Sequence, residues 1–249
     1  MEIVAIVNQK GGVGKSTTAF NLGVGLSSKG FKVLFVDCDA QGNLSDTARA
    51  DDSELTVIDL LRGKAKAENA IQRGERWDII PSSSVLAGAD IIISGRGKEN
   101  RLKEALEPVK ERYDYIILDT PPALGVIMTN ALTAASVAVI PTQADRYSLK
   151  GIAELYTTIG AVRKHSNATL RIKGVLLTRH NARAVLTREI VEVLEETAQK
   201  LGTKLFAAKI REAVAIKESQ TQREDIFTCA PKSNAAKDYR AFIDEFLRS

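Results

Sequence analysis

The sequence contains few of the residues from which disulfide scaffolds and metal cages are built. Its 249 residues include two cysteines, Cys38 and Cys229, and two histidines, His165 and His180. Two cysteines cannot form a disulfide framework, and the four residues together leave little material for a zinc site or a serine-type triad. Scarce cysteine is typical of the reducing cytoplasm, so we expect a cytoplasmic protein.

Long hydrophobic runs are also missing. No segment approaches the roughly 18 consecutive apolar residues of a transmembrane helix. The chain begins Met-Glu-Ile-Val-Ala-Ile, a strand-like pattern without a basic leader or a cleavage site, so we expect no secretory signal. A hydrophobic content of 44% with 27% charged residues is ordinary for a globular protein. Since no linker or repeat interrupts the chain, we predict one domain spanning residues 1–249.

The net charge is small but unevenly distributed. The whole chain carries +4, whereas residues 163–223 hold 13 Lys or Arg against 6 Asp or Glu, a net charge of +7. The remaining residues carry −3, from 22 basic and 25 acidic side chains. A basic region of this kind indicates an anionic partner, and it is the reason to consider DNA.

Short β-branched runs alternate with amphipathic stretches of helical length. The predicted strands are residues 3–7, 32–36, 77–80, 115–118, 137–140 and 174–177. The predicted helices are residues 15–29, 99–112, 149–164 and 187–201. Because the strands are nearly continuous hydrophobic runs, they are expected to be covered on both faces. The alternation predicts an α/β fold: a doubly wound, mainly parallel sheet with helices on both faces.

Residues 234–249 form one apolar stripe at helical spacing. The stripe has two interpretations, a membrane-surface helix or a helix docked on the domain core. The polar face mixes Asp238, Asp244 and Glu245 with Lys237, Arg240 and Arg248, whereas a membrane-targeting helix is more clearly basic. We therefore predict docking on the core and no membrane partner.

A glycine-rich segment separates the first predicted strand from the first predicted helix. It reads Asn8-Gln9-Lys10-Gly11-Gly12-Val13-Gly14-Lys15-Ser16-Thr17. Glycines let the backbone turn several N–H groups toward phosphate oxygens, and the helix start adds its positive dipole end. Lys15 is then expected at the β- and γ-phosphates and Ser16 at Mg²⁺. The predicted ATP-binding residues are Lys10, Gly11, Gly12, Val13, Gly14, Lys15, Ser16 and Thr17.

The loop departs from the ordinary Walker A pattern, because Gln9 stands where glycine is required and Lys10 precedes the glycines. In this it resembles the deviant Walker A motif of the ParA/MinD family of ATPases, in particular its small ParA members. The resemblance implies a P-loop fold, ATP and Mg²⁺ as cofactors, and a sandwich homodimer in which Lys10 contacts the other subunit's nucleotide. A cation supplied in trans would stabilise the charge of phosphoryl transfer.

Two aspartate motifs follow predicted strands. Phe35-Val36-Asp37-Cys38-Asp39-Ala40-Gln41-Gly42-Asn43 resembles the family's first switch, which implies that Asp39 positions the attacking water and Asp37 supports Mg²⁺. Ile116-Ile117-Leu118-Asp119-Thr120-Pro121-Pro122 resembles the Walker B strand and second switch, which implies that Asp119 reaches the metal through water. Open α/β sheets bind ligands at the carboxyl ends of their strands, where these motifs meet. The predicted catalytic residues are Lys10, Lys15 and Asp39, and the predicted metal site comprises Ser16, Asp37 and Asp119.

Two later segments resemble family segments near the adenine, with differences. Arg179 replaces a common methionine in Leu176-Leu177-Thr178-Arg179-His180-Asn181-Ala182-Arg183, and Arg211 replaces a proline in Ile210-Arg211-Glu212. Non-specific DNA binding needs only basic side chains facing phosphates. The predicted DNA-binding residues, all in the +7 region, are Arg183, Arg188, Lys209, Arg211 and Lys217.

The resemblance implies a DNA-partitioning ATPase. Its ATP-bound dimer binds the nucleoid and leaves it when a ParB-like partner stimulates hydrolysis, and so segregates a plasmid, a mobile element or a chromosome. Four alternatives stay open at the level of sequence. They are a positioning ATPase for a protein cargo, a MinD-like membrane-cycling ATPase, a metabolic ATP-dependent synthetase, and a DNA-binding protein without activity.

Overall fold

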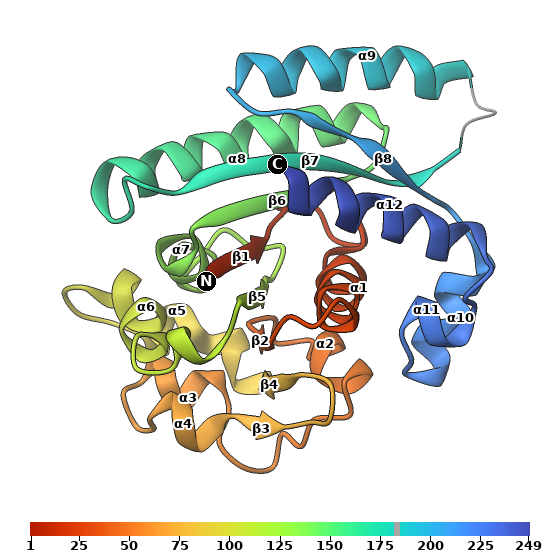
Figure 1. The fold of residues 1–249 in the computed structure, drawn as a ribbon. Helices are drawn as coiled ribbons and strands as arrows, with labels where there is room; N and C mark the ends of the chain where they lie inside the picture. The colour runs from red at the N-terminus through yellow and green to blue at the C-terminus, as the bar shows by residue number, and fades with distance from the viewer. Residues whose placement is uncertain (182–184) are drawn as a thin grey trace.

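The core of the protein is one eight-stranded sheet, seen in a computed structural model that describes residues 1–181 and 185–249 (Figure 1). The strand order is β3-β4-β2-β5-β1-β6-β7-β8, and every neighbouring pair is parallel except β3 with β4. The strands are β1 (Glu2–Ile6), β2 (Val33–Asp37), β3 (Gln72–Arg73), β4 (Asp78–Ile80), β5 (Tyr115–Asp119), β6 (Val137–Thr142), β7 (Arg171–His180) and β8 (Leu205–Arg211).

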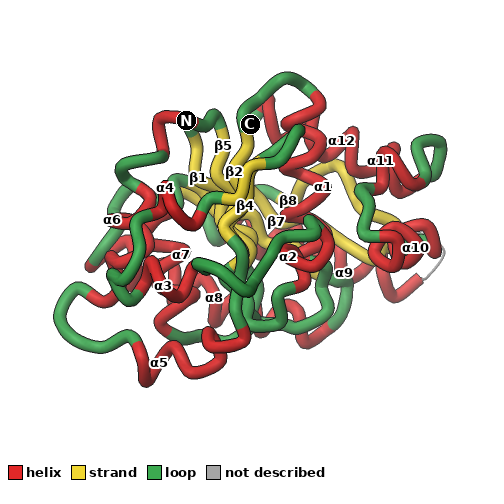
Figure 2. The backbone as a smooth tube through the Cα atoms, turned by 90° about the horizontal axis from the view of Figure 1, so that it is seen from below, coloured by secondary structure: helices red, strands yellow, loops and turns green. Residues whose placement is uncertain are grey.

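Helices cover both faces of this sheet (Figures 1 and 2). The α-helices are α1 (Lys15–Ser28), α2 (Asn43–Thr47), α3 (Val57–Leu61), α4 (Ala67–Ala70), α5 (Ala89–Ile92), α6 (Arg101–Leu106), α7 (Val126–Ala134), α8 (Arg146–His165), α9 (Val185–Lys200), α10 (Val214–Gln222), α11 (Ile226–Cys229) and α12 (Asn234–Arg248). Three short 3-10 helices are η1 (Ser84–Gly88), η2 (Lys98–Asn100) and η3 (Lys110–Arg112).

The sheet separates two hydrophobic cores. Along β1, Val4 and Ile6 join the core under α1 and α12, whereas Ile3 and Ala5 join the core under α7, α8 and α9. Alternate residues of one strand therefore serve opposite faces, and both faces are apolar because both are covered. The predicted fold class is confirmed.

The predicted elements differ from the structure in two ways. The helix expected over residues 99–112 is divided into η2, α6 and η3, and the prediction missed the strands β3 and β8 and the helices α2, α3, α4, α5, α7, α10 and α11. The end of α6 has a local cause, since it ends two residues before Pro108, which has no backbone N–H to continue the helical hydrogen bonds. β8 carries Lys209 and small residues at an edge of the sheet, so it lacks the hydrophobic run that identified the inner strands.

Helix α12 docks on the core as its apolar stripe predicted, with Tyr239, Phe242 and Phe246 at 1% exposure or less. Its polar face also contributes to the fold. The Glu245 carboxylate accepts hydrogen bonds from the backbone N–H groups of Ala207 (3.1 Å) and Ala208 (3.0 Å) on the edge strand β8. The helix thus satisfies strand donors that have no neighbouring strand. No helix in the described part of the chain is both long and apolar enough to span a bilayer.

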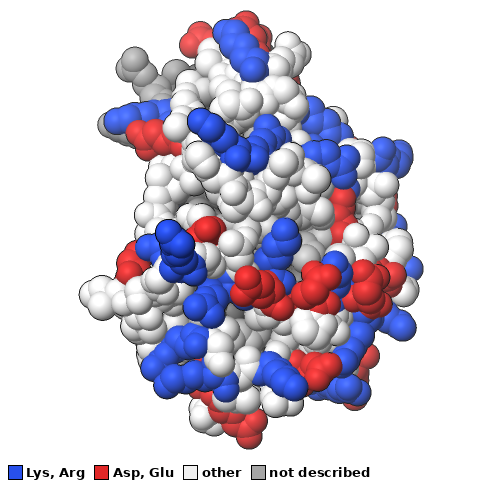
Figure 3. All heavy atoms as spheres, turned by 90° about the vertical axis from the view of Figure 1, so that its left-hand side faces the viewer, with Lys and Arg blue, Asp and Glu red and all other residues white. Residues whose placement is uncertain are grey.

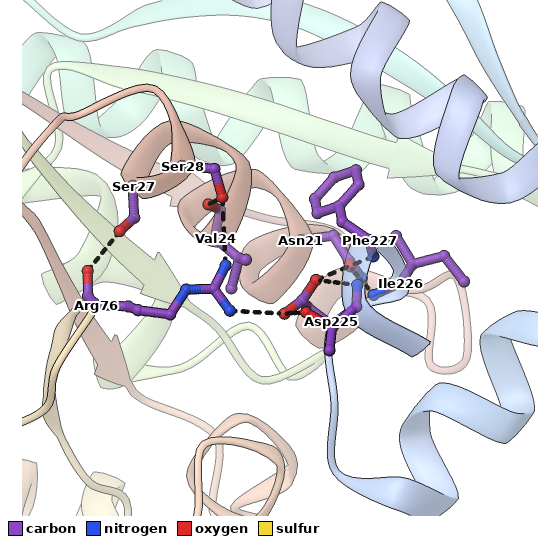
Figure 4. Close-up of polar contacts among 9 residues, drawn as sticks. Asn21, Val24, Ser27, Ser28, Arg76, Asp225, Ile226 and Phe227 are labelled. Atoms are coloured by element: carbon purple, nitrogen blue, oxygen red, sulfur yellow. Dashed lines mark hydrogen bonds and ion pairs between the residues drawn. The ribbon is translucent and has the colours of Figure 1, made fainter. Parts of the chain in front are cut away.

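One buried carboxylate caps helix α11 and ties it to the turn between β3 and β4, and Asn21 ties it to α1 (Figure 4). Asp225 accepts from the backbone N–H groups of Phe227 and Thr228, each at 2.9 Å, and pairs with Arg76 at 3.0 Å. Asn21 of α1 accepts from the backbone N–H of Ile226 at 3.0 Å. These contacts fix the segment that contains α10 against the start of the chain.

Candidate active site

The glycine-rich segment forms a turn between β1 and α1 in the conformation that glycine permits. Gly12 and Gly14 have φ of 72° and 83°, in the left-handed region that side chains disfavour. A Cβ added at Gly11, Gly12 or Gly14 would meet no atom within 4 Å, so the inner side of the turn is open. Helix α1 starts at Lys15, and the N–H groups of a first helical turn lack intrahelical acceptors. The turn therefore has the geometry of an anion cradle.

Neighbouring strands hold the turn by its carbonyl oxygens. Thr178, at the end of β7, bonds to the Val13 carbonyl at 2.8 Å, and Gln143, after β6, donates to the Gly12 carbonyl at 3.1 Å. Because these carbonyl groups point toward the protein interior, the N–H groups of the turn face the opposite side, where the cavity lies. Sequence reasoning placed Thr178 in a segment near the adenine without foreseeing this contact, and it did not identify Gln143. Both follow the rule used for the aspartates, since they stand at carboxyl ends of parallel strands.

Lys15 lies inside the site with 6% of its surface exposed. Burial lowers the pKa of its ammonium group, while the charges of Asp119 and Asp39 oppose that change. Its Nζ donates to the carbonyl oxygen of Lys10 at 3.2 Å. The side chain is thus held toward the inside of the turn, where the sequence placed it.

Asp37 ends β2 and holds the segment that follows it. Its carboxylate accepts from the Asp39 backbone N–H at 3.1 Å and from the backbone N–H and hydroxyl of Ser45, both at 2.8 Å. Burial raises its pKa to about 6, and the hydrogen bonds from Ser45 and Asp39 limit the rise. Asp37 therefore shapes the first switch, and in this structure both of its carboxylate oxygens accept hydrogen bonds from the protein itself.

Asp39 and Asp119 face the turn from two strand ends. Asp39 is 8% exposed and lines the cavity beside the turn. Asp119 is fully buried, and neither of its carboxylate oxygens makes a hydrogen bond within the described residues. Burial and the charge of Asp37 raise its pKa, although the Ser16 hydroxyl is near enough to oppose the rise. Among the described residues no group of three or more His, Cys, Asp or Glu forms a metal cage.

The Asp119 oxygens and the Ser16 hydroxyl fit Mg²⁺. This ion is bound by one or two protein oxygens, several waters and phosphate oxygens rather than by an all-protein cage. A buried carboxylate without hydrogen bonds is otherwise costly, so a cation or its water shell is the partner that this position requires.

The turn opens into a cavity of about 480 Å³. Its inner end is lined by Gly11, Gly12, Gly14, Lys15, Ser16, Thr17 and Asp39. Its outer end is lined by Thr178, Arg179, Ile210, Glu212, Ala213, Ile216, Lys217, Gln220 and Tyr239. Gln220 of α10 donates to the Thr17 hydroxyl at 2.8 Å, which joins the two ends. Phosphate chemistry at one end and apolar groups with amides at the other suit a nucleotide.

Lys10 and Lys15 point to different places. Of the residues that the structure describes, those lining the cavity include Lys15 but not Lys10. The Lys10 ammonium instead lies 2.5 Å from Asp145, which precedes α8. The two lysines that sequence reasoning grouped together are therefore separated, and Lys10 is turned away from the cavity of its own chain.

The basic residues predicted to bind DNA have different surroundings. Arg211 is held by Asp238 of α12 at 2.6 and 2.9 Å. Lys217 is exposed and lines the cavity, and Lys209 is half-buried on β8. Arg183 lies outside the described residues, as does the side chain of Arg188.

Comparison with known proteins identifies a matching family model and relatives that align along nearly the whole chain. Residues 1–172 match a family model described as an AAA domain. The chain is 42% identical over 243 residues to the sporulation initiation inhibitor protein Soj of Bacillus subtilis, covering 96% of this chain and 95% of that protein. It is 35% identical to the chromosome partitioning protein ParA of Caulobacter vibrioides, covering 99% of this chain and 94% of that one.

A solved structure agrees in fold over the whole chain. It is the cobyrinic acid a,c-diamide synthase of Mycobacterium smegmatis with a bound ATP analogue and magnesium, at 30% identity and a TM-score of 0.85. The match covers 100% of this chain and 95% of the other. The same backbone thus accommodates an ATP analogue and magnesium in that protein.

Proposed function

The chain belongs to the ParA/Soj family of P-loop ATPases, and from that premise we propose that it is an ATP-dependent DNA-partitioning ATPase. Its ATP-bound form is a sandwich homodimer that binds DNA non-specifically in the cytoplasm, on the nucleoid. A ParB-like partner stimulates hydrolysis, the dimer opens and the DNA is released. The observation that carries the proposal is the meeting of Lys15, Asp39 and Asp119 at one glycine turn.

Each side chain of the site has a role in ATP hydrolysis. Lys15 and the backbone of the turn bind the phosphates, and Gln220 closes the cavity over Thr17. Asp39 orients the attacking water, because its carboxylate lines the cavity while its backbone is fixed by Ser82, which donates to the Asp39 carbonyl. Ser16 and Asp119 would hold Mg²⁺, which would supply positive charge beside the phosphates. Asp37 keeps the first switch in place around Asp39.

Dimerisation completes the site. In one chain the Lys10 ammonium does not line the cavity. Among the basic residues that do, Lys15 lies at the glycine turn, while Arg179 and Lys217 line the outer end. A second chain that presents its own Lys10 to the phosphates supplies a further cation at the turn and makes hydrolysis depend on the dimer.

In this proposal DNA binding depends on two chains acting together. The face shown in Figure 3 carries Lys and Arg interspersed with Asp and Glu, so that face offers no single basic surface. Arg211 is already engaged by Asp238. Two chains brought together by ATP double the number of phosphate contacts, and linked weak contacts bind far more tightly than single ones.

The position of α12 argues against the membrane-cycling alternative. Its apolar stripe is buried against α1 and β8, so it is not available to a lipid surface without unfolding from the core. Vesicle co-sedimentation with ATP tests this point, and we expect the protein to stay in the supernatant.

An ATP turnover assay tests the proposal as a whole. We expect slow hydrolysis by the protein alone and faster hydrolysis with DNA and the product of the adjacent gene. DNA retention should need ATP and should be lost in Lys15→Ala. Equal DNA binding by Lys15→Ala and the unchanged protein would refute ATP gating, and absence of turnover under every combination would refute the ATPase.

A further inference from the structure

The Lys10 ammonium is bound within its own chain by a residue 135 positions away. Lys10 Nζ lies 2.5 Å from Asp145 Oδ2, and the two side chains are 34% and 32% exposed. Asp145 is also the N-cap of α8, since its Oδ1 accepts from the Ser148 backbone N–H at 3.0 Å. The Asp145 carboxylate therefore joins the start of α8 to Lys10 of the glycine-rich loop.

The backbone of Lys10 is fixed on both sides. Its N–H donates to Asn8 Oδ1 at 2.9 Å, and its carbonyl accepts from Lys15 Nζ at 3.2 Å. Asn8 in turn donates to the Pro141 carbonyl at 2.7 Å. Only the side chain of Lys10 can therefore change its partner without moving the phosphate loop.

Electrostatics favour an ionised Asp145 at the start of α8. The start of α8 carries the positive end of the helix dipole, which attracts Asp145 and repels Lys10. Burial would raise the pKa of Asp145, but the hydrogen bonds from Lys10 and from Ser148 outweigh it, and its pKa lies below the ordinary value. Asp145 is thus ionised at neutral pH, and its charge is what keeps Lys10 beside α8.

We propose that Asp145 is a cis anchor, a positioning residue that holds Lys10 until a second copy of the chain presents the phosphates of its nucleotide. The inference rests on the proposed function, in which Lys10 acts on the other subunit. Lys10 must leave Asp145 before it can cross, so the anchor opposes closure once in each chain. Because the pair is one-third exposed, it is weak enough to break: two such pairs change the dimer dissociation constant roughly 2- to 30-fold.

Asp145→Asn separates the anchor from the helix cap. Asparagine caps a helix as well as aspartate does, so α8 keeps its start while the charge that holds Lys10 is lost. Thermal melting of the full chain should therefore show little change. The first measurement is the acylation rate of Lys10 by an amine-reactive ester, read by mass spectrometry with the exposed Lys150 as internal reference. We expect Lys10, and not Lys150, to react several-fold faster in Asp145→Asn.

The second measurement is sedimentation velocity with a non-hydrolysable ATP analogue. Asp145→Asn should dimerise at a lower protein concentration than the unchanged chain. An unchanged Lys10 acylation rate would overturn the anchor, as would an equal or higher dissociation constant in a variant that melts normally. If the unchanged chain forms no dimer with the analogue, the proposed function fails, and the acylation rate still decides whether Asp145 holds Lys10.

Discussion

At the scale of single residues, three buried aspartates have three different environments within one site. The Asp37 carboxylate accepts hydrogen bonds from Ser45 and Asp39. The Asp119 carboxylate makes no hydrogen bond among the described residues, and Asp39 lines the cavity. Burial sets the first two apart from an ordinary surface carboxylate by raising their pKa values. The proposed function thus assigns support, metal binding and water positioning to three neighbouring residues.

Removal of the Asp39 carboxylate should separate ATP binding from hydrolysis. In Asp39→Ala we expect turnover to fall by at least about 100-fold, because a positioned acid–base group contributes on that order. Nucleotide affinity should remain within a few-fold, since Lys15 and the turn are untouched. Steady-state ATP hydrolysis measures the turnover, and equilibrium binding of a fluorescent ATP analogue measures the nucleotide affinity. Asp52→Ala, at an exposed loop position, is the matched control and should change neither.

The sequence predicted the site residues whose role follows from a local motif. Lys15, Asp39 and Asp119 stand where the glycine turn and the strand ends indicate. The contacts of Thr178, Gln143 and Asp145 were missed because they join segments more than 130 residues apart, which no local spacing reveals. Asp145 still carried a signal, since it precedes a predicted helix as an N-cap residue does.

At the scale of elements, the cavity depends on short helices that cannot be stable alone. Helix α11 has four residues, and α10 beside it lines the outer end of the cavity. Asn21 holds α11 to α1 (Figure 4), and the hydrogen bond from Gln220 to Thr17 holds α10 to α1. A nucleotide pocket built in this way couples its affinity to the packing of the carboxyl-terminal segment.

Asp225→Ala should therefore reduce both stability and nucleotide affinity. Loss of the α11 cap and of the bond to Arg76 should cost about 2 kcal/mol of unfolding free energy in a denaturant titration. Asp225→Asn keeps one oxygen to cap α11 and loses the ion pair between this buried carboxylate and the partly exposed Arg76, so it should cost less than Asp225→Ala. Equal losses in the two variants would show that the cap does not hold this segment.

The bond of Glu245 to β8 predicts a pH dependence of stability. Burial alone would raise the pKa of Glu245, but the N–H groups of Ala208 and Ala207 and the charge of Lys204 hold it below its ordinary value. The ionised Glu245 carboxylate therefore stabilises the folded protein fully above the ordinary carboxyl pKa. This stabilisation is lost as the pH falls through the lowered pKa of Glu245 in the folded protein. Glu245→Gln should cost about 1–2 kcal/mol at neutral pH, and the cost should shrink in acid.

Chemical unfolding at several pH values measures this difference. The control is Asp244→Asn, since Asp244 makes only an exposed ion pair with Lys29 and should change stability by less than about 1 kcal/mol. A cost of Glu245→Gln that stays constant from neutral to acid pH would contradict the role assigned to the charge.

The alternation of elements was predictable, and their limits were less so. Inner strands such as β1 and β5 are almost continuously apolar, apart from Glu2 and Asp119 at their ends, because both faces are covered, and this makes them recognisable in the sequence. The edge strands β3 and β8 lack that pattern, and their positions depend on partners such as α12.

At the scale of the whole molecule, the proposed DNA binding depends on the basic residues of two copies acting together. Lys209 lies near the carboxyl end of β8, the same edge of the sheet as the cavity. In Lys209→Ala we expect the slope of log affinity for DNA against log salt to fall by about 2, one contact for each chain of a dimer. Lys200→Ala, at the end of α9 and paired with Glu196, is the control and should leave the slope unchanged. An unchanged slope in Lys209→Ala would remove that residue from the DNA surface.

The central claim is that Lys10 of one chain serves the nucleotide of another, and mixed dimers test it most directly. Lys10→Ala homodimers lack the crossing cation, and Asp39→Ala homodimers lack the water-positioning carboxylate, so each alone should be inactive. In a mixed dimer, the Lys10→Ala chain keeps its own Asp39 and receives Lys10 from its partner. An equal mixture should therefore recover about a quarter of the original turnover, from one competent site in each of the mixed half of the dimers. A mixture that forms mixed dimers but stays as inactive as its separate components would contradict the account.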